Sequence, residues 1–456
     1  MENQKTNNPT NIIEETKKTG RRISSSTTFR MIIIGALTLI LMIPMAFVSN
    51  LVSDRKYRKK KVISEINKSW GKSVEIYGPI LKIPYKTYKK TTYFDSNNKR
   101  VETTEFDGYE YLYTFPNELN IDGNIEGQPK KIGIYKSAVY KADNHISGDF
   151  TLPDFKKYDI KQTEVEWKKA EIIFKTTNNK GIVDKMIWQW NGEKFPFALS
   201  GKNNDKYFVF KTDFLGKSPF INNEKVKFEM SYKVKGSKTF KIIPIGNQTK
   251  VRLQSNWKDT KFEGYFLPDN EDKITETGFD AHWKVIDYQR AFSQYHLNQI
   301  PNFSSYAFGV NFIIPVDEYL KSDRATKYAY LVIFLTFIVF FIIQNVGKIE
   351  MHPFHYFLIG IALVVFYTLL ISISEHSNFN ISYLISASAT IGLISLYAKS
   401  ILKSKRFIGY IFTSLTMLYG YIYIIIQLDN YALLAGSIGL FIILAMIMYF
   451  SRKIKW

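Results

Sequence analysis

The chain contains 456 residues, carries a formal net charge of +20, contains no cysteine, and is 46% hydrophobic. Without a thiol, disulfide frameworks, thiolate nucleophiles, cysteine-ligated zinc and iron–sulfur clusters are excluded. Long uncharged runs gather in the first 51 residues and the last 130, a distribution that excludes a purely soluble enzyme.

The chain begins with a basic stretch, residues 1–28, that is rich in Asn and Thr and predicts a disordered cytoplasmic tail. Residues 29–51 follow and contain the uncharged run Met31–Ser49. A helix of about 20 mostly apolar residues crosses ~30 Å of hydrocarbon. Because about 30 residues precede the run and no small-x-small cleavage site follows it, we predict a retained anchor helix rather than a cleaved signal peptide.

Five further apolar runs follow Lys327 and predict a five-helix transmembrane region over residues 326–456. These runs are Tyr328–Val346, Tyr356–Ser374, Ile381–Leu402, Phe407–Gln427 and Tyr431–Phe450.

The distribution of Lys and Arg between the predicted loops gives the orientation, because cytoplasmic loops are enriched in both. The connections Glu375–Asn380 and Leu428–Asn430 contain neither residue type. The alternate connections and the C-terminal tail contain eight, namely Lys348, Lys399, Lys403, Lys405, Arg406, Arg452, Lys453 and Lys455. We therefore predict that both termini are cytoplasmic and that residues 52–325 lie outside. The basic run Arg55–Lys61 after the first span indicates either a solvated helix start or contact with anionic headgroups.

Residues 52–325 show the alternation that is typical of β-strands. Lys225–Val234 alternates polar and apolar residues without a fault, and Tyr109–Phe115 repeats the period with aromatic residues. One-sided apolar faces favour antiparallel sheets, packed as a sandwich or an open barrel, and we expect a sandwich-like domain. Helical pattern is confined to Asp54–Lys68 and Tyr288–Leu297. The predicted fold class is a membrane α-helical protein with six transmembrane helices and a large β-rich extracytoplasmic domain between the first and second.

The chain contains 30 Tyr, 35 Phe and 7 Trp. Exposed aromatic residues beside Lys could bind a glycan or single-stranded nucleic acid. In strands, however, aromatic residues more often form cross-strand packing pairs, and we expect that role here. No nucleic acid is expected as a partner outside the cytoplasm.

Several short segments, spread over most of the chain, resemble a known family. They are Tyr77-Gly78-Pro79 with Ile83-Pro84, Lys131-Ile132-Gly133-Ile134-Tyr135, Ser255-Asn256-Trp257, Phe266-Leu267-Pro268, Thr277-Gly278-Phe279, Ala281-His282-Trp283, Asp323-Arg324-Ala325-Thr326-Lys327-Tyr328-Ala329, His352-Pro353 and Ser374-Glu375-His376. Together they resemble the CreD family of bacterial inner-membrane, cell-envelope integrity proteins. The resemblance implies an N-terminal anchor, a periplasmic domain, a C-terminal helix group and a part in the envelope stress response. It implies no reaction, cofactor or catalytic residue.

Ionisable residues near the predicted membrane boundaries are candidate site residues, because charges are costly in hydrocarbon. Glu375 and His376 are expected at the outer end of the third span, and Asp323, Arg324 and Lys327 at the outer start of the second. Both sets belong to the same membrane face. We predict an interfacial polar clamp in which Glu375 pairs with Arg324 or Lys327. The alternative is a proton-sensing or ligand-sensing site.

Two other sequence patterns, a pair of histidines and a run of small residues, each allow more than one interpretation. His352 and His355 are three residues apart near Glu350, as in some metal sites, but no third ligand is evident. Helix capping and interfacial anchoring are therefore expected, and no metal or cofactor is predicted. The run Ile381–Leu402 is rich in Ser, Ala and Gly, which predicts close helix packing within the bundle or between copies in a homo-oligomer.

The predicted function is non-enzymatic: the periplasmic β-domain contacts an envelope protein or cell-wall component, and the helices fix it among the membrane lipids. The alternative is a membrane transporter or lipid-handling protein with an accessory periplasmic domain. A cell-wall enzyme would need clustered carboxylates in a cleft. Asp269, Glu271 and Asp272 are close in sequence, but we expect them in a solvated loop.

Overall fold

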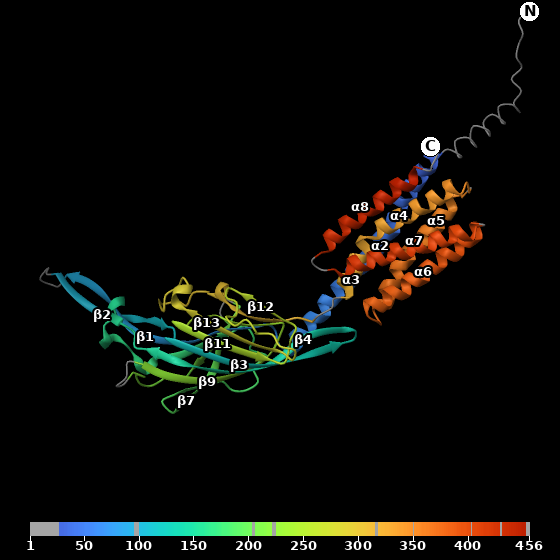
Figure 1. Ribbon diagram of the computed structural model, residues 1–456. Helices are drawn as coiled ribbons and strands as arrows, with labels where there is room; N and C mark the ends of the chain where they lie inside the picture. The colour runs from blue at the N-terminus through green and yellow to red at the C-terminus, as the bar shows by residue number, and fades with distance from the viewer. Residues whose placement is uncertain are drawn as a thin grey trace, which may run out of the picture. The chain divides into compact units, whose positions relative to one another are not determined.

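The computed structural model describes residues 27–94, 100–202, 206–220, 225–314, 318–349, 351–402, 404–428 and 431–452 (Figure 1). The chain forms two compact units: a helical unit, Met1–Lys60 with Val316–Trp456, and a β unit, Lys61–Pro315. The predicted disordered tail lies outside the described residues, apart from Thr27 and Thr28, which begin the first described helix. Lys403, Lys453 and Lys455, which were used to predict the orientation, also lie outside them.

A single helix, α2 (Thr27–Trp70), is continuous over 44 residues. It contains both the segment predicted as an anchor helix and the predicted helix Asp54–Lys68, so both segments are confirmed as helical and belong to one element. The helix continues past the apolar run because the following segment, from Asp54 to Lys68, is rich in Lys and Arg and contains no Gly or Pro.

The β unit is a 15-stranded sheet. Its strands are β1 (Val74–Phe94), β2 (Arg100–Thr114), β3 (Glu118–Ile132), β4 (Tyr135–Thr151), β5 (Glu171–Thr176), β6 (Ile187–Trp190), β7 (Glu193–Lys202), β8 (Phe208–Thr212), β9 (Lys225–Ser237), β10 (Thr239–Ile242), β11 (Gln248–Ser255), β12 (Thr260–Gly264), β13 (Phe279–Ile286), β14 (Tyr295–Leu297) and β15 (Phe308–Phe312).

The sheet is a nearly closed barrel rather than the sandwich that we expected. The strands follow the order β12-β15-β10-β1-β5-β8-β7-β6-β9-β4-β3-β11-β13, with β2 and β14 branching from β1. The two terminal strands lie beside each other, because the Phe262 ring of β12 is 5.6 Å from the Phe279 ring and 5.9 Å from the Trp283 ring of β13. The alternation of apolar residues is the same in a sandwich and in a barrel, so it could not distinguish them.

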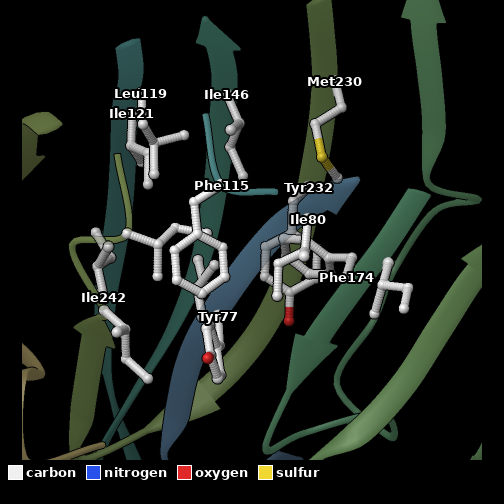
Figure 2. Close-up of a cluster of buried hydrophobic side chains, with 14 of the residues drawn as sticks. Tyr77, Ile80, Phe115, Leu119, Ile121, Ile146, Phe174, Met230, Tyr232 and Ile242 are labelled. Carbon is white, nitrogen blue, oxygen red and sulfur yellow. The ribbon is translucent and has the colours of Figure 1, made fainter. Parts of the chain in front are cut away.

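The barrel encloses one continuous apolar core, to which most strands contribute (Figure 2). Along β9, Val226, Phe228, Met230, Tyr232 and Val234 are all buried, as the alternation predicted. The Phe228 ring stacks on the Trp188 ring of β6 with centroids 4.4 Å apart. For these residues the predicted packing role of the aromatic side chains is confirmed.

The predicted helix Tyr288–Leu297 is wrong. A single 3-10 turn covers Asp287–Gln289, and the segment then becomes β14, which pairs with β2. Tertiary hydrogen bonds outweigh the local pattern here, because the Arg290 guanidinium donates to the carbonyls of Ile245 and Gly246.

Two long hairpins extend beyond the barrel wall. The β1–β2 hairpin keeps its register from Leu81–Thr114 out to Phe94–Arg100, with one irregularity at Thr87. The β3–β4 hairpin keeps its register out to the pair Ile132–Tyr135. The described strands of the two hairpins extend toward opposite ends of the β unit (Figure 1).

The helical unit contains the first part of α2 and the helices α3 (Glu318–Lys327), α4 (Ala329–Val346), α5 (Pro353–Ser374), α6 (Phe379–Ile401), α7 (Lys405–Gln427) and α8 (Ala432–Ser451). Among the described residues, six helices are long and apolar enough to cross a membrane, α2 and α4 to α8. They coincide with the six predicted spans, which are therefore confirmed as helices of spanning length.

Candidate functional site

Charged and amide side chains from five helices meet at one end of the helical unit. We name them the polar layer: Arg55 of α2; Lys321, Asp323, Arg324 and Lys327 of α3; Glu375 after α5; Asn380 of α6; and Gln427 of α7.

Glu375 forms an ion pair with Arg55. The sequence predicts Arg324 or Lys327 as the partner of Glu375, whereas the structure pairs this carboxylate with Arg55. The Arg55 side chain is 31% exposed and that of Glu375 is 16% exposed, so the pair is partly desolvated. Arg55 belongs to the basic run after the first span, and local sequence could not indicate that α2 passes the end of α5.

The predicted cations of α3 have other partners. Lys327 pairs with Asp323 one turn earlier, at 3.0 Å, but the Lys327 side chain is 71% exposed. Arg324 extends toward the carbonyl oxygens of Ile426 and Leu428, both 3.4 Å away. These carbonyls belong to the end of α7, where a helix leaves acceptors without an intrahelical donor and where a cation is favourable.

His376 is not part of the polar layer. Its backbone N–H donates to the carbonyl of Ile373 at 3.0 Å and ends α5. Its ring is exposed and has no side-chain partner among the described residues.

Sequence reasoning missed a chain of polar contacts that joins three helices. The Lys321 ammonium donates to Gln427 Oε1 at 2.7 Å, and Gln427 Nε2 donates to Asn380 Oδ1 at 2.5 Å. The available signal was the presence of Asn380 and Gln427 at the ends of predicted spans, where amide side chains can reach neighbouring helices.

The two histidines before α5 have separate roles. His352 Nδ1 accepts from the backbone N–H of Phe354 at 3.2 Å and caps α5, so its predicted capping role is confirmed. His355 Nδ1 lies 2.8 Å from the Tyr397 hydroxyl of α6. Glu350, which is close to both histidines in sequence, lies outside the described residues.

The β unit also contains buried carboxylates that the sequence did not single out, among them Glu75 and Glu171. Glu75 of β1 lies 2.8 Å from Lys206 and accepts a hydrogen bond from the Tyr207 hydroxyl. Burial, followed by that hydrogen bond to Glu75, raises the pKa of Tyr207 well above its usual value. Glu171 of β5 lies 2.7 Å from Lys82 and 3.2 Å from Lys211.

Comparisons with known proteins identify the family. A family model described as "Inner membrane protein CreD" matches residues 26–456. The chain belongs to the CreD family. Inner membrane protein CreD of Escherichia coli (strain K12) is 26% identical over 427 residues, which cover 92% of this chain and 91% of that protein. A solved structure of a proposed protease from Parabacteroides distasonis ATCC 8503 aligns over 50% of each chain at 10% identity. Its TM-score of 0.20 is too low to indicate a shared fold.

Membership of the CreD family, together with the apolar helices, makes this a multi-pass inner membrane protein. In this CreD-family chain the polar layer joins helices that are distant in sequence. Exposed ion pairs contribute about 0–1 kcal/mol each, whereas partly buried ones can be costly to break. Breaking the Arg55–Glu375 pair should therefore cost more than breaking the Asp323–Lys327 pair, whose lysine is 71% exposed.

A groove of about 670 Å³ lies between α6 and α7. It is lined mainly by apolar side chains together with Tyr383, Ser388, Gly392 and Tyr419. The small-residue helix α6 therefore has two faces. Ser382 and Ser386 are buried within the bundle, whereas Ser388 and Gly392 open on the groove.

Proposed function

We propose that the β unit of this CreD-family protein lies on the extracytoplasmic side of the inner membrane. There it binds an envelope protein or cell-wall component without catalysing a reaction. The loop charges support this orientation, because Lys and Arg occur only in alternate connections between the five C-terminal spans and in the tail that follows them. Large domains cross regardless of their own charge, so the basic β unit is compatible with that side.

The observation that carries the proposal is the exposed aromatic surface of the β1–β2 hairpin. We name this segment the arm, residues 85–94 and 100–110. Tyr88, Tyr93, Phe94 and Phe106 are all exposed on it. The rings of Tyr88 and Phe106 lie 6.3 Å apart, so part of this aromatic surface is contiguous. Soluble proteins rarely expose several large aromatic side chains in one contiguous patch, and aromatic residues are enriched in protein-binding sites.

The environment of the acidic residues supports a non-enzymatic role. Glu75 and Glu171 are held by lysine partners, as described above, and Asp269 accepts the backbone N–H of Lys284 at 2.7 Å. Each of these carboxylates therefore has a structural partner, which supports a role for them in the fold.

The groove between α6 and α7 supports a second candidate, a lipid-handling protein. Its volume and mainly apolar lining suit an acyl chain. The β unit would then be an accessory, and the arm would contact the protein that delivers or receives the lipid.

Photo-crosslinkers at Phe94 and Phe106 of the full chain in cells test the proposal, with Phe214, an exposed phenylalanine outside the arm, as the matched control. The proposal predicts capture of the same envelope protein or glycan from both arm positions and not from Phe214. Capture of cytoplasmic proteins from the arm would overturn it. A further crosslinker at Gly392 in the groove tests the second candidate. Capture of phospholipid at this position, with no capture from the arm, would favour a lipid-handling protein.

A further inference from the structure

The tip of the β3–β4 hairpin exposes apolar side chains beside lysines. A two-residue turn, Gly133-Ile134, joins the strands, with Gly133 at φ +59°, as type II′ turns require at their first central position. Ile132 is 50% exposed and Ile134 is 46% exposed. This segment is one of those through which the sequence resembles the CreD family, and none of the contacts described above explains why its tip is apolar.

Lys131 and Lys136 lie directly opposite each other on the two strands. Like charges in this position destabilise a hairpin. The sequence contains no Asp or Glu between Glu126 and Asp143, so the hairpin supplies no carboxylate of its own near its tip. An anionic surface would relieve the repulsion between the two lysines.

The root of this hairpin, the pair Gly127–Tyr140, lies where the chain enters and leaves the β unit. On the entering side, Trp70 at the end of α2 donates its indole N–H to the carbonyl of Tyr140 at 3.3 Å. On the leaving side, the Tyr140 ring lies 4.9 Å from the ring of Phe312 in β15. Both connections to the membrane-spanning segments therefore meet the β unit at this root.

From the root the hairpin runs back along α2. Ser137 donates to Asn67 Oδ1 at 2.8 Å, one turn before Trp70, and Lys130 lies 5.1 Å from the Trp70 ring. Six residues of strand beyond the root span about 20 Å, whereas the ten residues of helix from Lys61 to Trp70 span about 13 Å. The tip therefore reaches past the first residue of the β unit, toward the side from which the chain arrives. In sequence, the apolar run ends only about ten residues before Lys61.

We propose that the tip of the β3–β4 hairpin binds the surface of an anionic phospholipid bilayer. Ile132 and Ile134 enter the boundary between headgroups and acyl chains, and Lys131 and Lys136 bind phosphates. Exposed apolar residues flanked by Lys are typical of segments that lie in this interface, where each basic residue strengthens binding about fivefold. This site is distinct from the arm, which lies at the opposite end of the β unit (Figure 1).

The absence of cysteine from the chain allows a direct test. A polarity-sensitive fluorophore is attached to Ile134→Cys in the full chain in phosphatidylglycerol nanodiscs, and to Tyr93→Cys on the arm as the control. The proposal predicts blue-shifted emission, and quenching by a lipid-borne nitroxide, for the label at 134 only. Replacing Lys131 and Lys136 by Ser should reduce the ratio of membrane-bound to unbound hairpin tip, as reported by the label at 134, about 25-fold. Replacing Lys141, which is paired across the strands with Glu126, should leave it unchanged.

Three results would overturn the proposal. The first is a label at 134 as exposed to water as the label at 93. The second is a label that is shielded but not quenched by lipid nitroxide, which would indicate contact with protein. The third is equal quenching in phosphatidylcholine nanodiscs, which would remove the role of the lysines.

Discussion

Breaking the Arg55–Glu375 ion pair should destabilise the helical unit by an amount that depends on both partners. The side chains are 31% and 16% exposed, so the pair lies between a surface ion pair, about 0–1 kcal/mol, and a fully buried one, where removal of a partner costs about 3–5 kcal/mol. We expect about 1–3 kcal/mol for Arg55→Ala or Glu375→Ala alone. Because both single variants lose the same contact, the coupling energy should be about 1–2 kcal/mol.

A double-mutant cycle on the full chain in nanodiscs measures this coupling. At about 2–4 °C per kcal/mol for a unit of this size, it corresponds to about 2–8 °C in apparent Tm. The control is the same cycle on Arg324 and Glu375, which should be additive within about 0.5 kcal/mol. Additivity for Arg55 together with coupling for Arg324 would refute the pairing described here and restore the one predicted from sequence.

Three further predictions concern the β unit of the full chain. Phe228→Ala removes a ring packed against Trp188 and should cost about 3–5 kcal/mol, or about 6–20 °C in apparent Tm, whereas exposed Phe214→Ala should shift it by less than about 2 °C. Gly181→Ala would bring a Cβ against the Lys235 carbonyl oxygen, so expression or Tm should fall sharply, and wild-type stability would contradict this packing. Burial lowers the pKa of His296 below its ordinary ~6.5, with Arg290 adding to the effect and a hydrogen bond to the Ser293 carbonyl opposing it. The contribution of neutral His296 to the free energy of unfolding is therefore fully present above about pH 6.5 and declines as the pH falls below that value. Between about pH 7.5 and 5.5 the wild type should lose more Tm than His296→Gln, and equal losses would exclude this cause.

The spans and many strands could be predicted because each depends on local periodicity. A run such as Met31–Ser49 is apolar over the length of a bilayer, and β9 alternates because one face of it lines the core. The closure of the barrel could not be predicted in this way. It depends on β1 being long enough to pair with β10, β2 and β5, and on β7 pairing with both β6 and β8.

The candidate site could be predicted only as a location. The sequence placed Glu375, Asp323 and Arg324 near one membrane face, because charges gather where spans end. The partners depend on which helices are neighbours, and that follows from tertiary packing. Arg55 is more than 300 residues from Glu375 in sequence, so no local pattern relates them.

Cysteine accessibility can show on which side of the membrane the β unit lies, because the chain contains no cysteine. Single cysteines at Lys194 in the β unit and at Ser404 before α7 would be exposed to a membrane-impermeant maleimide in intact spheroplasts. An extracytoplasmic β unit predicts labelling of Lys194→Cys without permeabilisation and of Ser404→Cys only after it. Labelling of Ser404→Cys in intact spheroplasts, with Lys194→Cys protected, would contradict it.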